Sequence, residues 1–316
     1  MPRNAVQFQK GLSLAEFNRH YGTEDQCHLA LVAMRWPDGF VCPKCSGSKH
    51  SFCEPKRLFQ CTACRLQTSV RAGTIFHKSR TPLTKWFLAM HLMTSAKNDI
   101  AALELARQID VKWDTAWLIK QKLMEVMLQR NSIYKLSGDV QIDDAYQGGE
   151  KAGKPGRGAR NKVPFVVAVQ TRKGKPIYTQ LRCVPAFTSA AIKDYASSSI
   201  EPGTRVLSDG LGCFNGLADA GLKHTAKITG GGRPEGIEFK WVNTGLGNVK
   251  GAITGTLRSC DAHHTPRYLA AFEWRYNRRF ELPKNLERLA RVAATIAPQP
   301  RKFIAAIRPK SADLSG

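Results

Sequence analysis

Four of the nine cysteines form two CxxC pairs. Cys42-Pro-Lys-Cys45 and Cys61-Thr-Ala-Cys64 are separated by 15 residues and surrounded by lysines and arginines. Four thiolates suit tetrahedral zinc, and CxxC turns on two facing hairpins deliver that geometry. Redox dithiols are the alternative, but no thioredoxin-like strand-helix-strand pattern encloses either pair. We therefore predict a zinc ribbon with one structural Zn²⁺, bound by Cys42, Cys45, Cys61 and Cys64.

Two aspartates stand where the carboxylates of a second metal site could meet. Asp143 follows Val-Gln-Ile, and Asp209 follows Arg-Val-Leu-Ser at the end of another apolar run. In a sheet of the ribonuclease H type the first and fourth strands are neighbours, so both carboxylates would converge and hold Mg²⁺ or Mn²⁺. Two such ions can activate an attacking hydroxyl and stabilise the leaving oxygen of a phosphodiester. Each Asp alone could be a turn residue. We expect Asp144 to point to the opposite face from Asp143.

The helix expected to supply a third ligand contains no Glu. Its sequence, FKWVNTGLGNVKGAITGTLRS, places Asn243 and Lys250 seven residues apart, about two helical turns, on one face. Asn243 could offer a carbonyl oxygen to a metal, while Lys250 binds a phosphate as a point charge. Alternatively, Asn243 is a helix cap.

The helical block before this region spans residues 78–134. Apolar residues repeat at helical spacing in TPLTKWFLAMHLM, IAALELARQI and WDTAWLIKQKL. A short break at residues 110–112 between the last two predicts a helix-turn-helix that presents Lys120 and Lys122 to the major groove of DNA. An ordinary helical hairpin with Trp113 and Trp117 in its core would have the same pattern.

From residue 138 the pattern changes to short runs rich in β-branched and aromatic residues, namely VQIDDAYQ, VPFVVAVQT, KPIYTQLRCV and TRVLSD. Helices are expected at residues 188–198, at 211–220 and from 243 onward. A basic loop follows the first run and carries Lys151, Lys154, Arg157, Arg160 and Lys162. We predict an α/β fold with four parts: residues 1–75 as the zinc ribbon with an N-terminal helix, 76–136 as the helix-turn-helix-like region, 137–282 as the catalytic domain, and 283–316 as a basic C-terminal tail.

The charge balance indicates a polyanionic partner. Lys and Arg total 48 against 25 Asp and Glu, which gives a net charge of +23 over 316 residues, of which 42% are hydrophobic. This composition describes a folded protein that attracts a polyanion, and it excludes a wholly disordered chain. The apolar runs are far shorter than the roughly 20 residues of a membrane span, and the first 14 residues have no signal-peptide pattern. With its scattered remaining cysteines, the protein is expected in the cytoplasm, associated with the nucleoid and not with a membrane.

Taken in order, these motifs resemble the bacterial insertion-sequence DDE transposases that begin with a zinc ribbon, the ISXO-like family. The resemblance covers about residues 11–281 and is carried by CPKC...CTAC, VQIDDAYQGG, VLSDG, WVNTGLGNVKGAITGT and FEWRYNRR. It implies a ribonuclease H-like catalytic domain that uses two Mg²⁺ or Mn²⁺ ions. It also implies cleavage at the element's ends and transfer of the freed 3′-hydroxyl into target DNA.

Carried over residue by residue, the family's two catalytic aspartates match Asp143 and Asp209. The usual Glu of the final helix falls on Asn243, as in one branch of the family, and the Lys seven residues later falls on Lys250. The implied partners are the terminal inverted repeats, target DNA and further copies of the chain. Two other functions stay open: a DNA-binding regulator derived from an inactive transposase, and a ribonuclease H-like nuclease that performs no strand transfer.

Overall fold

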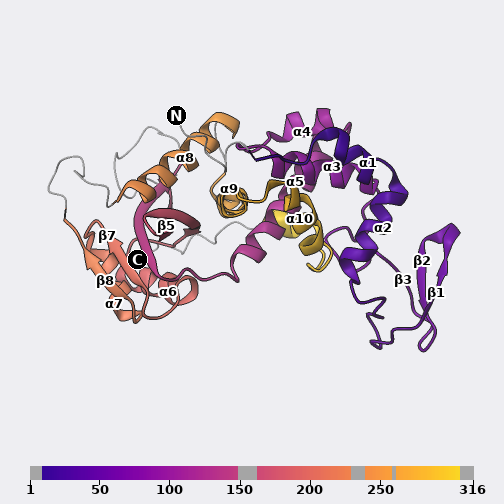
Figure 1. The fold of residues 1–316 in the computed structure, drawn as a ribbon, viewed down its shortest axis with the longest axis horizontal. Coiled ribbons are helices and arrows are strands. Elements are labelled where there is room, and N and C mark those ends of the chain that lie inside the picture. Colours follow the sequence, from indigo (N-terminus) through magenta and orange to yellow (C-terminus); the bar gives the residue numbers. More distant parts are fainter. Residues whose placement is uncertain (1–8, 149–161, 229–238, 258–260, 307–316) are drawn as a thin grey trace. The chain divides into compact units, whose positions relative to one another are not determined.

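The structure of the chain, a computed structural model, describes residues 9–148, 162–228, 239–257 and 261–306. They form two compact units (Figure 1). The ribbon unit contains the residues up to Val126 together with Phe280–Ile304, and the sheet unit contains Met127–Arg279. Most of the predicted basic loop, from Lys151 to Arg160, lies outside the described residues. Within the described ranges, no helix combines the length and the apolar character that a membrane span needs.

The ribbon unit begins with two capped helices and a small sheet. Helices α1 (Leu14–Tyr21) and α2 (Glu24–Arg35) each start with a capping box, in which the N-cap hydroxyl and a side chain three residues later bind each other's backbone N–H groups. The strands β1 (His50–Cys53), β2 (Leu58–Cys61) and β3 (Gln67–Ser69) pair antiparallel in the order β1-β2-β3. A short 3-10 turn, η1 (Glu54–Lys56), joins β1 to β2.

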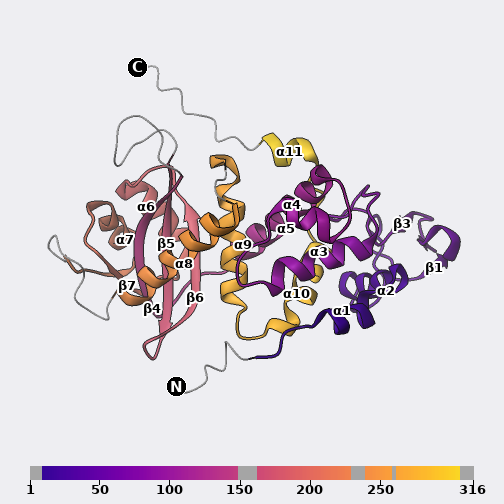
Figure 2. The same cartoon turned by 90° about the horizontal axis from the view of Figure 1, so that it is seen from above.

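The remaining helices of the ribbon unit are α3 (Leu83–Ser95), α4 (Ala102–Gln108), α10 (Asn285–Ala293), α11 (Arg301–Ala306) and most of α5 (Trp113–Asn131). Helix α10 packs on α3 and α2 (Figure 2) and buries Leu286, Leu289 and Ala293. The segment predicted as a basic tail therefore contributes apolar side chains to a core. The ribbon and the helical block, expected as two domains, form one unit.

The predicted break between α4 and α5 is present, and Asp110 within it has a positive φ of 50°. The prediction that Lys120 is presented to DNA is wrong. Its side chain is only 1% exposed, and its Nζ lies 2.7 Å from Oδ2 of Asp99. Lys122 is half-buried, and burial lowers the pKa of its ammonium group. Trp113, by contrast, is 50% exposed, so it does not form the core of a simple hairpin.

The sheet unit contains the five strands β4 (Asp139–Gln147), β5 (Val163–Arg172), β6 (Lys175–Cys183), β7 (Arg205–Ser208) and β8 (Lys223–Ala226). Their spatial order is β6-β5-β4-β7-β8; β4, β5 and β6 pair antiparallel, whereas β7 and β8 run parallel to β4. The first and fourth strands are thus neighbours, as predicted. This order is that of a ribonuclease H-like sheet.

Helices cover both faces of this sheet (Figure 1). On one face, α6 (Ser189–Ser199), the 3-10 turn η2 (Gly212–Asn215) and α7 (Gly216–Asp219) pack on a core that includes Val140, Ile142 and Val166. On the other, α8 (Lys240–Leu257) and α9 (Thr265–Asn277) pack on Val167 and Val169. The 3-10 turns η4 (Ala262–His264) and η5 (Leu282–Lys284) lie before and after α9. Because β5 is buried on both faces, its sequence is a continuous apolar run rather than an alternating one.

Two contacts fix α8 on the sheet. Oε1 of Gln141 on β4 accepts the backbone N–H groups of Trp241 and Val242, each at 3.1 Å, so a strand side chain satisfies donors of the first helical turn. A Cβ at Gly245 would lie 3.4 Å from Cγ2 of Val169, and glycine there permits the close approach of helix and sheet. These contacts fix the position of α8, and with it the helix's exposed face, relative to β4.

Candidate active site and metal centre

Three carboxylates meet at the point where β4 continues past the end of β7. The two strands pair only from Asp139 to Gln141, and β7 ends at Ser208, directly before Asp209. Each of Asp143, Asp144 and Asp209 offers one carboxylate oxygen, and these oxygens all lie within 4.8 Å of one another. The structure therefore brings Asp143 and Asp209 together, in agreement with the convergence expected for adjacent first and fourth strands.

Asp144 faces the opposite side of the sheet from Asp143, as expected, and a carboxylate oxygen of Asp144 nevertheless lies within the group. The alternation of the strand is regular, because Asp143 pairs with Val167 on the α8 face and Asp144 pairs with Val166 on the α6 face. At this level, however, β7 has already ended, so it no longer separates the two faces along that edge of β4. A carboxylate oxygen of Asp144 consequently lies in the same group as those of Asp143 and Asp209.

The crowding of negative charge changes the acidity of the site. Burial, and then the charges of Asp144 and Asp209, raise the pKa of Asp143 to about 6. The Asp144 backbone N–H, which donates to Oδ1 of Asp143 at 2.8 Å, and the ammonium of Lys250 act in the opposite direction. A half-buried group of three carboxylates is a donor set of hard oxygens, and it suits Mg²⁺ or Mn²⁺.

The loop that carries Asp209 is fixed by its own contacts. Oδ1 of Asp209 accepts the backbone N–H of Leu211 at 3.0 Å, which is an Asx-type turn. Gly210 between them has a φ of 85°, a conformation that glycine adopts without strain. The carboxylate is thus held at the strand end by a short turn.

Helix α8 supplies the other two predicted residues. Lys250 is exposed and lies close enough to Asp143 to lower the pKa of that carboxyl. Asn243 is also exposed, seven residues earlier on α8, and no described contact joins its side chain to the carboxylates. The alternative that Asn243 caps the helix is wrong, because α8 begins at Lys240 and Gln141 binds the first N–H groups.

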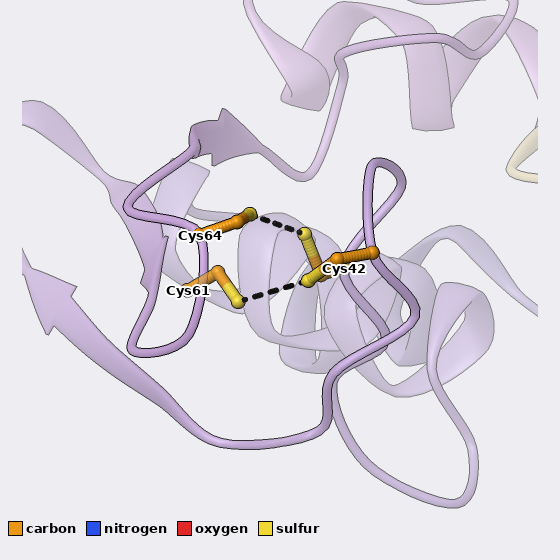
Figure 3. Close-up of side chains that lie close together, drawn as sticks. Cys42, Cys61 and Cys64 are labelled. Atoms are coloured by element: carbon orange, nitrogen blue, oxygen red, sulfur yellow. Dashed lines mark hydrogen bonds between the residues drawn. The ribbon is translucent and has the colours of Figure 1, made fainter.

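The four predicted cysteines form a second candidate metal site, in the ribbon unit. The Sγ–Sγ distance is 3.5 Å between Cys42 and Cys64 and 3.6 Å between Cys45 and Cys61 (Figure 3). A tetrahedron with metal–sulfur bonds of 2.3 Å has edges of about 3.8 Å, so the four thiols match a Cys₄ site. Burial opposes ionisation of Cys42, but the N–H donors of Lys44 and Cys45 outweigh it and lower the pKa of this thiol to about 6.

A third group of possible ligands, Asp261, His263 and His264, lies between α8 and α9. Nδ1 of His264 is 3.0 Å from Nη1 of Arg267, and the Arg267 side chain is almost completely buried. A fixed guanidinium at the ring nitrogen opposes the approach of a further cation. We therefore assign no metal to this group.

Two family models match parts of this chain. Residues 135–277 match the ISXO2-like transposase domain, and residues 22–67 match the transposase zinc-ribbon domain. Over 130 residues the chain is 31% identical to an uncharacterized protein in transposable element ISH50 of Halobacterium salinarum. That match covers 40% of this chain and 42% of the relative, which is less than half the relative's length.

Among solved structures, the chain is similar to a pre-cleavage Mos1 transpososome, with 12% identity over 60% of this chain and 73% of that chain and a TM-score of 0.20. It is also similar to the Mos1 strand transfer complex, with 13% identity over 57% of this chain and 72% of that chain and a TM-score of 0.21. Structural likeness at these TM-scores adds nothing to the assignment, which rests on the two domain matches. By those matches, residues 22–67 resemble a transposase zinc ribbon, and they precede a region, residues 135–277, that resembles an ISXO2-like transposase domain of the DDE class.

Proposed function

We propose that this protein is the transposase of a bacterial insertion sequence. It would bind the ends of its element, cleave there, and transfer the freed 3′-hydroxyl into target DNA. The observation that carries the proposal is the group of carboxylates from Asp143, Asp144 and Asp209 at the open end of β7, within a domain that matches a transposase family. The net charge of +23 supports a DNA partner.

In this proposal Asp143 and Asp209 hold divalent cations, Mg²⁺ or Mn²⁺, which when bound activate the attacking oxygen and stabilise the leaving oxygen of a phosphodiester. Lys250 neutralises charge beside Asp143 and contacts the scissile phosphate as a point charge. Asn243, on the same exposed face of α8, contributes an amide oxygen in place of the Glu of other members. The charges of Asp144 and Asp209 both raise the pKa of Asp143.

The ribbon unit has a separate role in the proposal. Cys42, Cys45, Cys61 and Cys64 bind one Zn²⁺, and the Cys₄ donor set leaves no open position for a substrate. The metal then stabilises a small basic fold that contacts the terminal inverted repeats, together with the exposed start of α5 around Trp113. We expect the protein to act on DNA as a homo-oligomer, at the nucleoid.

Joining of a labelled element end to a supercoiled plasmid tests the proposed activity. The wild-type protein is expected to produce a joined product with Mg²⁺ or Mn²⁺. The yield of that product is expected to fall more than about 100-fold in Asp143→Ala and Asp209→Ala, whereas loss of a residue that only orients a metal ligand typically costs about 10–100-fold. Both variants should retain DNA binding in a mobility-shift assay. Asp139→Asn, a loss of charge on the same strand, serves as the control.

The other two functions predict different products in the same assay. A ribonuclease H-like nuclease would hydrolyse the DNA and yield no joined product. A DNA-binding regulator would bind the ends and neither cut nor join them. Full joining by Asp143→Ala would show that the carboxylate group is not the catalytic site.

A further inference from the structure

Helix α8 contains no acidic residue, although in this family the helix normally provides the third carboxylate of the metal site. From Lys240 to Leu257 it has neither Asp nor Glu. With Asp143 and Asp209 as the only carboxylates, two divalent ions with four positive charges would face two negative charges. An amide oxygen at Asn243 adds a ligand atom but no charge.

The structure contains a third carboxylate at this place, and it comes from β4. A carboxylate oxygen of Asp144 lies within 4.8 Å of those of Asp143 and Asp209, a separation that a bound cation can close with metal–oxygen distances of roughly 2.0–2.6 Å. Asp144 is half-buried, like its two neighbours in the group. Its backbone N–H already donates to Asp143, so one short segment of β4 organises two of the three carboxylates.

Another aspartate on the same strand shows what a structural carboxylate looks like in this sheet. Oδ1 of Asp139 lies 2.6 Å from Nε of Arg205 on the adjacent β7, and this contact lowers the pKa of Asp139. Four residues further along, β7 has ended and the neighbouring groups of Asp143 include two more acids. Along β4 the surroundings of the acids therefore change from Asp139, which pairs with Arg205, to Asp143, whose pKa is raised by Asp144 and Asp209 and lowered by Lys250.

We propose that Asp144 supplies the third carboxylate of the divalent-metal site and thereby compensates for the absence of an acid on α8. The proposal rests on the proposed function and assigns a metal ligand within that site. The total carboxylate charge at the site is then −3, the same as with a Glu on the helix. The third carboxylate has moved from the helix to the strand.

The test compares six full-length proteins, each with its zinc site filled: wild type, Asp143→Asn, Asp144→Asn, Asp139→Asn, Asn243→Glu and the double variant Asp144→Asn with Asn243→Glu. Binding of Mn²⁺ is measured by electron paramagnetic resonance, because Mn²⁺ favours oxygen ligands over the thiolates of the ribbon. Asp144→Asn is expected to weaken Mn²⁺ binding by at least about tenfold and to shift strand joining to higher Mg²⁺. Asp139→Asn should match the wild type.

The double variant provides the sharpest comparison. Because Asn243→Glu restores a carboxylate on α8, it is expected to recover most of the Mn²⁺ affinity that Asp144→Asn loses. Thermal melting without added divalent metal separates a ligand from a structural residue. Because Asp144→Asn removes one of three neighbouring like charges, which offsets the loss of contacts made by that charge, the variant is expected to melt near the wild type, whereas a structural role would lower its melting temperature.

Each contrary outcome has a defined meaning. If Asp144→Asn binds Mn²⁺ as tightly as wild type while Asp143→Asn does not, the assignment of Asp144 is overturned and the proposed function stands. Lower stability of Asp144→Asn without metal, with no recovery in the double variant, also overturns it. If the wild-type protein neither binds Mn²⁺ nor joins DNA, the proposed function itself fails.

Discussion

Asn277 on α9 binds both backbone polar groups of Thr179 on β6. The Thr179 N–H donates to Oδ1 at 2.8 Å, and Nδ2 donates to the Thr179 carbonyl at 2.9 Å. Two residues along the strand, the Leu181 N–H donates to Oε2 of Glu273 at 3.0 Å. Since β6 is an edge strand, these side chains occupy hydrogen-bonding groups that another strand could otherwise pair with.

Replacement of Asn277 should therefore destabilise the sheet unit. Asn277→Ala is expected to lower the free energy of unfolding by about 1–3 kcal/mol, because it leaves two backbone groups of Thr179 without their partner. Urea denaturation followed by fluorescence measures the change. Asn215→Ala is the matched control, since the Asn215 side chain is exposed and makes no cap hydrogen bond. Equal stability of the two variants would contradict the expectation.

Removal of metal from the ribbon should unfold that part of the chain selectively. Elemental analysis is expected to find one zinc per chain, and Cys64→Ser or a chelator should make residues 42–71 sensitive to protease, because metal binding and folding are coupled in small Cys₄ sites. The five-stranded sheet should persist. Cys53→Ser is the control, since Cys53 lies between the two pairs in the sequence but is not a member of the Cys₄ group. Purified protein without zinc would refute the site.

Binding to DNA should depend steeply on salt. If the protein neutralises 6–10 phosphates, affinity should fall by about 10³- to 10⁵-fold between roughly 50 and 200 mM salt, through release of counterions. Replacing Lys151, Lys154, Arg157 and Arg160 by Ala should reduce the slope by about one for each phosphate that is no longer neutralised. Arg291→Gln serves as the control, because Arg291 already pairs with Glu287 at 2.8 Å. A slope near zero for the wild type would exclude this mode of binding.

His264 should contribute a loss of stability in the sheet unit as the solution becomes acidic. Burial, and then the charges of His263 and Arg267, lower the pKa of His264 from 6.5 to about 4, while Asp261 acts in the opposite direction. Between pH 6.5 and 4 the unfolded chain binds a proton that the folded chain excludes, so stability decreases as pH falls, by up to about 1.4 kcal/mol per pH unit.

Urea denaturation at several pH values checks this contribution. His264→Gln should reduce the slope of the free energy of unfolding against pH between pH 6.5 and 4, by the contribution of His264. His20→Gln is the control, because His20 is exposed in the ribbon unit. An unchanged slope in His264→Gln would mean that His264 is not the titrating group.

Several features could be predicted from the sequence because each rests on a local pattern. The spacing of the CxxC pairs predicts the Cys₄ group, and short β-branched runs predict the strands of the sheet unit. Asp143 and Asp209 converge because the first lies on the first strand, the second directly follows the fourth strand, and these two strands are adjacent. These inferences need only residue types and the order of elements along the chain.

Other features depend on where elements end and on what packs against them. Alternation along β4 predicts that Asp143 and Asp144 face opposite sides of the sheet, which is correct, but it does not reveal that the early end of β7 at Ser208 allows the carboxylate of Asp144 to join the group. Lys120 has the sequence context of a DNA-facing lysine, yet it pairs with Asp99 from the loop between α3 and α4 and is buried. The role of Asn277 depends on an edge strand almost one hundred residues away, which no local pattern reveals.

The ribbon unit is discontinuous in sequence, and this has a consequence for synthesis on the ribosome. Helices α2 and α3 are made early, but α10, which covers their apolar side, is made only after the whole sheet unit. At roughly 5–20 residues per second, the intervening segment takes on the order of ten seconds. The unit that begins first is thus completed last, and a nascent chain carries an uncovered apolar surface, open to chaperones, until the sheet unit has emerged.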